Sequence, residues 1–419
     1  MVIVAGIAQF INGGFYLMGL SVYFLPITRD LNLSRTALSV AFTLRSLEGG
    51  LESPIVGYLI DRLGPRFMFR AGMTMGGIGF ILLAFTHDYV SFLFVFLGVL
   101  ALGFAGGVVL PLSTLMNHWF SRQRAFAVTI AQVGSEVGGT LLTPFVAYLV
   151  LNVGWRQAAI FSGIVYLFSM PFLSHFMRNT PESMGLGPDG DPPRHRIEPV
   201  SHASGAHGGA IRTRDDGDFT VREALSTKAF WHLTVAVGVR MFSKSSLMVH
   251  LVPLLVWKGF DEQTAALLVG LFALVQIPLR IGAGHVADRW SMTRVPALST
   301  LAGAGSIAVL LMGGQSSLAV GALFVILFAL AETGNSPAWA LIGHFFGRAN
   351  FASIRGSLNF FHSLISLPAP IVAGWLFDTT GSYQLALLPI GCFYVLAFML
   401  FWVLQPPRKR TTAPAATGS

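Results

Sequence analysis

Charge is scarce in this chain: 11% of its 419 residues are Asp, Glu, Lys or Arg, whereas 53% are hydrophobic and the mean hydropathy is +0.66. A soluble domain carries about 25% charged residues, so this chain has too few to cover a surface that faces water. Cysteine is rarer still, because Cys392 stands alone and one thiol excludes a disulfide framework within the chain. The composition predicts a membrane protein.

Several motifs that would indicate other functions are also missing. The sequence has no GxxxxGK[ST] phosphate loop, so a gradient of ions or substrate must drive any transport. No nucleic-acid motif accompanies the net charge of +8, and we expect no nucleic-acid partner. Without a nucleophile elbow we expect no enzyme, and without a common metal spacing, even at His195, His202 and His207, we expect no metal or cofactor.

Long apolar segments fill most of the chain. A spanning helix needs about 20 mostly apolar residues, and this rule predicts twelve transmembrane helices. No basic region precedes Val2, so we expect the first helix to act as its own insertion signal. The predicted spans lie near 2–26, 36–58, 67–86, 90–116, 125–151, 156–177, 229–256, 262–284, 295–313, 317–346, 352–376 and 383–404.

The loop cations predict the direction of these spans. If both termini are cytoplasmic, eighteen Lys and Arg residues fall on the cytoplasmic face and four on the other. The four are Arg29, Arg35, Arg156 and Lys258. The positive-inside rule therefore favours cytoplasmic termini in the inner (plasma) membrane of a bacterium.

Residues 178–228 interrupt the apolar pattern with a stretch rich in Pro, Gly, Asp and Arg. This stretch buries little apolar area, so we expect a cytoplasmic linker with a short helix near 219–226. It divides the chain into a six-helix bundle over 1–177 and a second over 229–404, with a cytoplasmic tail at 405–419.

A charged motif recurs in both halves, each time between two spans. The second copy stands 227 residues after the first and lacks the inner glycine. The first copy contains Gly57, Asp61, Arg62, Gly64 and Arg66, and the second contains Gly284, Asp288 and Arg289.

Two six-helix halves, a cytoplasmic linker and this repeated motif resemble the major facilitator superfamily over essentially the whole chain. The resemblance implies a twelve-helix, all-α fold in which the motif residues form a cytoplasmic gate for one state of an alternating-access carrier. Other stretches resemble the monocarboxylate-porter and oxalate:formate-antiporter group. They include Asn117–Ala125, Gly154–Arg156, Pro181–Gly185, His250–Leu255 and Ala373–Tyr383.

The group resemblance places a substrate-binding arginine at Arg280 and puts His362 where oxalate carriers have a lysine. Gln276 stands where monocarboxylate carriers often have an aspartate, and the first-span lysine of the animal members is absent. These departures leave the substrate open.

Charged residues inside the spans are the remaining candidates, because a charge in the bilayer persists when it faces a partner or a wet cavity. Arg240 and Lys244 share one helix face, and with Arg280 they predict a carboxylate clamp. The alternative is permanent pairing of the first two with Glu136 or Glu332. Arg355 lies near a helix end and is expected to snorkel to the interface.

Arg45, Glu48 and Glu52 share a face of the second span. Arg45 is a further substrate candidate, or it only forms an internal ion pair with Glu48. Glu48 is our first candidate for the coupling proton, with Glu136 and Glu332 as alternatives. Glu52 is expected to belong to the gate.

These patterns predict a secondary carrier of small organic anions that works by proton symport or anion exchange, as a monomer with the anion, protons and the lipid bilayer as partners. A carrier of a neutral or cationic solute, such as a drug or sugar, is the alternative. It would be favoured if every buried cation were paired with one of the four buried acids. A transport-inactive sensor is less consistent with the short linker and tail.

Overall fold

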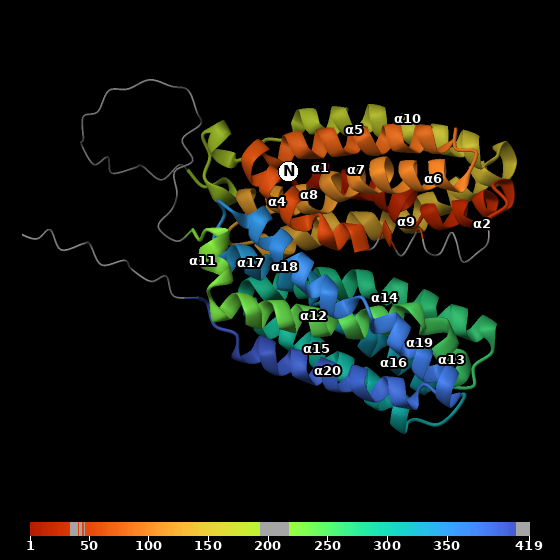
Figure 1. Ribbon diagram of the computed structural model, residues 1–419. Helices are drawn as coiled ribbons and strands as arrows, with labels where there is room; N and C mark the ends of the chain where they lie inside the picture. Colours follow the sequence, from red (N-terminus) through yellow and green to blue (C-terminus); the bar gives the residue numbers. More distant parts are fainter. Residues whose placement is uncertain (34–40, 42–43, 46, 193–217, 408–419) are drawn as a thin grey trace, which may run out of the picture.

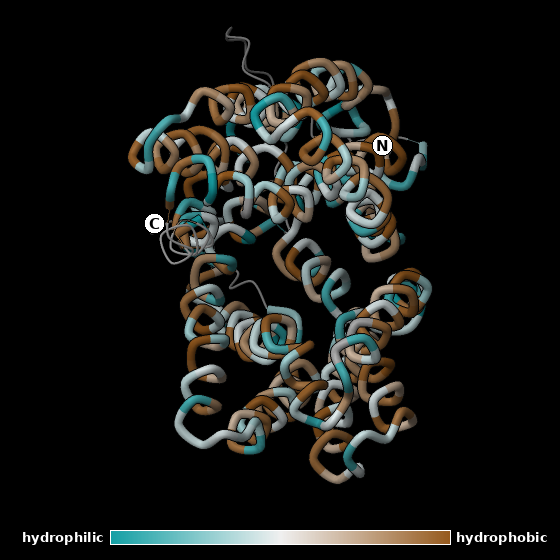
Figure 2. The backbone as a smooth tube through the Cα atoms, turned by 90° about the vertical axis from the view of Figure 1, so that its right-hand side faces the viewer, coloured by the Kyte–Doolittle hydropathy of each residue, from teal (hydrophilic) through white to brown (hydrophobic). Residues whose placement is uncertain are grey.

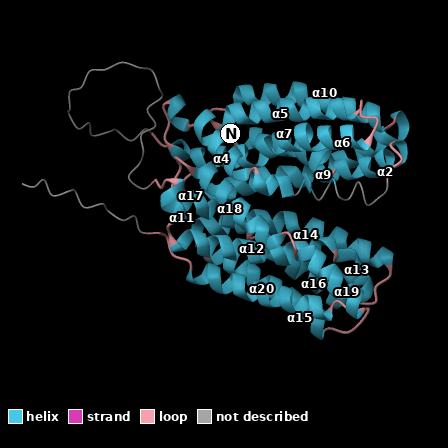
Figure 3. Ribbon diagram, in the orientation of Figure 1, coloured by secondary structure: helices cyan, strands magenta, loops and turns pink. Residues whose placement is uncertain are grey.

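The computed structural model describes residues 1–33, 41, 44–45, 47–192 and 218–407. Within these residues the chain folds into helices joined by loops, and they contain no strand (Figure 3). His195, His202, His207 and the tail from 408 onward lie outside the described residues. The short helix expected near 219–226 is present as α11 (Val221–Leu225), which Thr220 and Glu223 cap reciprocally.

The first half forms one bundle (Figure 1). Its elements are α1 (Val2–Asn12), η1 (Gly13–Leu17), α2 (Leu20–Asp30), α4 (Ser53–Leu63), α5 (Pro65–Leu83), α6 (Tyr89–Val95), η2 (Phe96–Ala101), α7 (Leu102–Phe104), η3 (Ala105–Val109), α8 (Leu110–Trp119), α9 (Arg124–Val153) and α10 (Trp155–Phe176). Of these, η1, η2 and η3 are π-helical segments. Two short 3-10 turns, η4 (Pro181–Met184) and η5 (Pro188–Gly190), follow.

The second half forms another bundle. Its elements are α12 (Lys228–Val249), α13 (Leu251–Trp257), α14 (Glu262–Arg289), α15 (Arg294–Met312), α16 (Leu318–Glu332), α17 (Asn335–Phe346), α18 (Phe351–Ser366), α19 (Ala369–Thr380) and α20 (Gln384–Val403). In the part of the chain that the structure describes, nine helices are long and apolar enough to cross a membrane, or ten if α12 and α13, bent by 66°, count as one. The other two expected spans are 36–58, which includes undescribed residues, and 67–86, where α5 lies.

Each bundle has its own apolar core. One large cluster of buried side chains draws only on residues 5–177, and two others draw only on residues 219–404. Figure 2 shows the two groups of helices end-on, with hydrophobic residues along most of them. Separate cores allow each bundle to move as a unit, as alternating access requires.

The bundles meet at the end that carries α11 and the described parts of the linker, which we call the linker end; they diverge towards α2 and α13 (Figure 1). Two small apolar clusters join them there. One contains Val56, Ile60, Leu110 and Ala352, and the other contains Ala125, Ala287, Val295 and Ala340.

At the first of these clusters the backbones of α4 and α18 also pack closely. A Cβ atom added to Gly57 of α4 would collide with the Ala352 backbone of α18, and one added to Gly356 would collide with the Ser53 backbone. Glycine at both positions therefore lets α4 and α18 approach each other closely.

We predict that Gly57→Ala opens the linker end. In a Cys392→Ser background, a cysteine at the fully buried position Ile60 would react with a maleimide faster by about tenfold, because overpacking costs about 1–3 kcal/mol. Gly282→Ala is the matched control, since an added Cβ there has nothing within 4 Å. Equal reaction rates in the two variants would contradict this prediction.

Candidate functional site

The aspartates of the two gate motifs each cap a helix of the other bundle. Asp61 on α4 accepts hydrogen bonds from the backbone N–H groups of Ala352 (3.2 Å) and Ser353 (2.7 Å), at the start of α18. Asp288 on α14 does the same for Ala125 (2.9 Å) and Phe126 (2.7 Å), at the start of α9. A carboxylate at a helix N-terminus satisfies free N–H groups and the helix dipole, so both contacts hold the linker end closed.

The motif arginines have other roles in this state. Arg66 ties α5 to the end of α10 by donating to the Ser174 carbonyl at 2.9 Å. Arg62 is exposed and donates to the Tyr58 hydroxyl on the same helix. Arg289 is exposed at the end of α14. Gly64 forms the turn before α5 with φ +88°, a conformation that favours glycine.

A buried charge cluster lies inside the second bundle. Glu332 at the end of α16 is fully buried and lies 2.9 Å from Lys244 Nζ and 3.5 Å from an Arg240 guanidinium nitrogen. Arg240 is also fully buried and donates to the Asn335 side chain and the Ala331 carbonyl. The structure therefore pairs Arg240 and Lys244 with Glu332, which was the alternative to an open clamp. Two cations share one carboxylate, so the cluster keeps an excess of positive charge.

A second ion pair joins the two bundles. Arg280 on α14 donates from Nη1 to Glu136 Oε1 on α9. The contact is one-point, because the buried atoms Arg280 Nε and Glu136 Oε2 have no hydrogen-bond partner among the described residues. An arginine can bind a carboxylate through two nitrogens, so this pair leaves part of its binding capacity unused.

The repeat of the gate motif allows the α9–α14 interface to be compared with the α4–α18 interface, position by position. Asp61 and Asp288 stand 227 residues apart, as do the first residues they cap, Ala125 and Ala352. The same offset matches Arg280 with Ser53, and Glu136 with Ser363. The two interfaces therefore share a frame of glycines and aspartates, but only the α9–α14 interface carries the ion pair.

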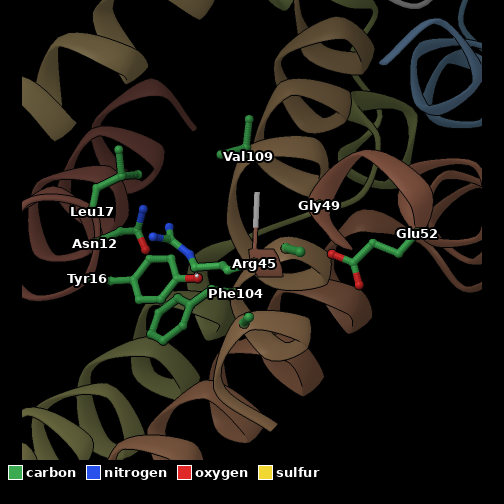
Figure 4. A pocket seen from close by; sticks show the side chains of 10 residues that line it. Asn12, Tyr16, Leu17, Arg45, Gly49, Glu52, Phe104 and Val109 are labelled. Atoms are coloured by element: carbon green, nitrogen blue, oxygen red, sulfur yellow. Dashed lines mark hydrogen bonds between the residues drawn. The ribbon is translucent and has the colours of Figure 1, made fainter. Parts of the chain in front are cut away.

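The first bundle contains a pocket with a volume of about 270 Å³ (Figure 4). Arg45 lies on its wall, 4.4 Å above the Tyr16 ring, and donates to the Tyr16 hydroxyl at 2.8 Å. Asn12 lies beside them, and Glu52 directs its carboxylate into the pocket from the other side. Residues of the three π-helical segments complete the wall; such segments are frequent at functional sites.

The two acids that follow Arg45 along the chain, Glu48 and Glu52, are not paired as expected. No ion pair joins Arg45 to Glu48 within the described residues, and Glu48 Oε2 lacks a hydrogen-bond partner there. Glu52 lines the pocket, and among the described residues neither of its oxygens has a hydrogen-bond partner, so it takes no part in the Asp61 contact that closes the gate. Of the proton candidates, Glu48 has no ion pair among the residues that the structure describes, whereas Glu136 and Glu332 each bind a cation.

His362 and Arg355 lie on α18. His362 is buried and bonds the Asn359 side chain at 2.9 Å, and Asn359 in turn donates to Ser53 of α4. Arg355 is only 4% exposed and its guanidinium lies 4.8 Å from the Trp339 ring centre. The expectation that Arg355 snorkels to the interface is therefore wrong, because its side chain points into the protein.

Tyr16 and Trp339 were not singled out as site residues. Tyr16 and Asn12 follow one face of the first span beside the glycine pair that becomes η1. That Gly-Gly step within an apolar helix was the available signal. Trp339 gave none, because an apolar run contains many aromatic residues whose partners depend on tertiary packing.

Comparison with known proteins gives the same architecture. The sequence model of the Major Facilitator Superfamily matches residues 5–370. The chain is 27% identical to the "Probable L-galactonate transporter" of Escherichia coli (strain K12), over 93% of this chain and 86% of the relative. It is also 27% identical to "Monocarboxylate transporter 12" of Rattus norvegicus, over 82% of this chain and 74% of the relative.

A third relative and a solved structure extend this result. The "Glycerol-3-phosphate transporter" of Bacillus subtilis (strain 168) is 25% identical over 67% of this chain and 63% of the relative. The crystal structure of the transporter FucP in the outward conformation superposes with a TM-score of 0.72 at 13% identity, covering 96% of this chain and 98% of that chain. At this identity the likeness shows the fold alone.

We predict that Glu332→Gln destabilises the protein by about 3–5 kcal/mol, because it leaves the buried Arg240 and the partly buried Lys244 without a negative partner. Glu182→Gln removes the exposed pair with Arg348 and serves as the control, with an expected loss below about 1 kcal/mol. Unfolding in detergent, followed by the melting temperature, compares them. A similar small loss in both variants would contradict the cluster's role.

Proposed function

Since the chain belongs to the Major Facilitator Superfamily, we propose that it is a secondary carrier of small organic anions, mono- or dicarboxylates. It is a multi-pass membrane transporter and not an enzyme. We further propose that the linker end faces the cytoplasm of a bacterium, because most loop cations lie at that end. The observation that carries the anion proposal is the excess of positive charge in the second bundle and at its border with the first.

Three cations, Arg240, Lys244 and Arg280, face two carboxylates in the second bundle and at its border. Burying a net positive charge is costly unless an anion completes the site. Three relatives are named as transporters of L-galactonate, monocarboxylates and glycerol 3-phosphate, and each of these substrates is an anion. A small organic anion fits both facts, and galactonate and the monocarboxylates are carboxylates.

We infer that Glu136 occupies the substrate's place on Arg280 when the site is empty. Replacing one carboxylate by another keeps the guanidinium paired, so the exchange avoids exposing a lone buried charge. Arg280 Nε, which has no partner among the described residues, would make the second bond to the substrate. The displaced Glu136 is then a carboxylate without a cation in a poorly hydrated place, which favours its protonation.

This exchange couples the anion to a proton. Substrate binds as Glu136 takes up a proton, and substrate release returns Glu136 to Arg280 as the proton leaves. The Arg280–Glu136 pair links the two bundles, so its opening also loosens the contact between them. Proton symport follows from this scheme, and exchange of two anions follows if the carrier crosses only when loaded.

A carrier of a neutral solute is the rival function. It gains support from the pairing of Arg240, Lys244 and Arg280 with glutamates, and one structural neighbour is named a fucose:proton symporter. However, Arg45 bonds a tyrosine and Arg355 stacks on a tryptophan, so the buried cations are not all matched by acids.

We predict that reconstituted protein exchanges lactate, galactonate or glycerol 3-phosphate, and that Arg280→Gln raises the KM by about tenfold or more because a charged hydrogen bond is lost. Counterflow with the three labelled anions and with fucose provides the test. Arg294→Gln, an exposed arginine, is the control. Transport of fucose without any of the anions would overturn the proposal.

In the wild type we expect the rate of uptake to rise as the pH falls. We predict that Glu136→Gln abolishes this pH dependence, because the amide cannot exchange a proton. The KM should fall by about threefold or more, since no internal carboxylate competes for Arg280. Initial rates between pH 5 and 8 measure both effects. The proton would be assigned to Glu48 instead if the pH dependence persisted in Glu136→Gln and disappeared in Glu48→Gln.

A further inference from the structure

Arg355 is a buried cation that the proposed exchange at Arg280 does not use. Its side chain belongs to the first turns of α18, and the residue is 4% exposed. Among the described residues it forms no ion pair and its Nη1 has no hydrogen-bond partner. A guanidinium carries five N–H donors, so leaving it buried without an acceptor is costly.

The surroundings of Arg355 form a short column of polar and aromatic groups. Its guanidinium covers the Trp339 ring, and the centre of that ring lies 5.4 Å from the ring of His362. His362 Nδ1 is also buried without a partner among the described residues. At 1.5 Å per residue, Arg355 lies about 6 Å from the start of α18 and His362 about 16 Å, so the column runs from the linker end towards the middle of the helix.

Asp61 closes this column at the linker end. It occupies the N–H groups of Ala352 and Ser353, one turn before Arg355. When the bundles separate at this end, the Asp61 carboxylate leaves those N–H groups. They then become available one turn before Arg355 on the same helix, and these N–H groups and the guanidinium together would bind an anion.

We propose that Arg355 is a second carboxylate site, on the linker-side half of the path, which takes the substrate after the Asp61 contact opens. This inference rests on the proposed function, since it assigns the same class of substrate to a new position. Trp339 holds the guanidinium in place by stacking, and Asn359 and His362 follow further along α18, away from the linker end. The site therefore acts on binding from the linker side and not from the far side.

The test compares the two faces of the membrane. The KM for the labelled anion that the wild type exchanges fastest, among lactate, galactonate and glycerol 3-phosphate, is measured in right-side-out and inside-out vesicles. Arg355→Gln should raise the KM on the linker side by about tenfold, because a charged hydrogen bond is lost, and change the far-side KM by less than about twofold. Arg355→Lys should give an intermediate value, because lysine keeps the charge without the planar fork.

Arg294→Gln is the matched control, because Arg294 also lies over tryptophans, at 5.6 Å from Trp402, but is exposed. Equal KM increases on both faces would place Arg355 in the central site and overturn the proposal. So would a lower melting temperature with both KM values unchanged, which would make Arg355 structural. If the wild type carries none of the anions, the proposed function itself fails, a result distinct from either outcome.

Discussion

The structure depends on one constraint: a charge buried between apolar helices needs an opposite charge or an ordered hydrogen-bond partner beside it. Arg280 and Glu136 meet this need across the two bundles, and Arg240 and Lys244 meet it within one bundle through Glu332. The bundles have separate apolar cores and small shared clusters, so polar contacts and helix caps, together with the close packing of α4 on α18, set their relative position. A ligand that replaces a polar contact can therefore change how the bundles sit.

The two halves close the linker end through the same kind of contact, but they differ in the residues that lie deeper between the bundles. Asp61 and Asp288 each cap a helix of the opposite bundle, and both contacts lie at the linker end. Deeper along the same interfaces, one has two serines and the other has Arg280 and Glu136. In our proposal the repeated glycines and aspartates allow the bundles to move against each other. The residues that differ between the two interfaces then recognise the substrate.

Much of this could be predicted from the sequence, because it depends on local patterns. Apolar length predicts the helices, the recurrence of Asp61 and Asp288 predicts paired gate loops, and Arg280 stands out as a charge within a span. The partners could not be predicted, since Glu136 is 144 residues from Arg280 and only the packing of α9 on α14 brings them together. Arg45 bonds Tyr16 and not its helix neighbour Glu48, and Arg355 points inward, for the same reason: tertiary packing decides where a long side chain extends.

The most direct test of the account is the number of protons taken up when a carboxylate binds. Calorimetric titration of the detergent-solubilised protein in two buffers of different ionisation enthalpy measures this number through linkage. The account predicts uptake of about one proton per bound carboxylate in the wild type and almost none in Glu136→Gln. The same proton uptake in both proteins would show that the substrate does not displace Glu136 from Arg280.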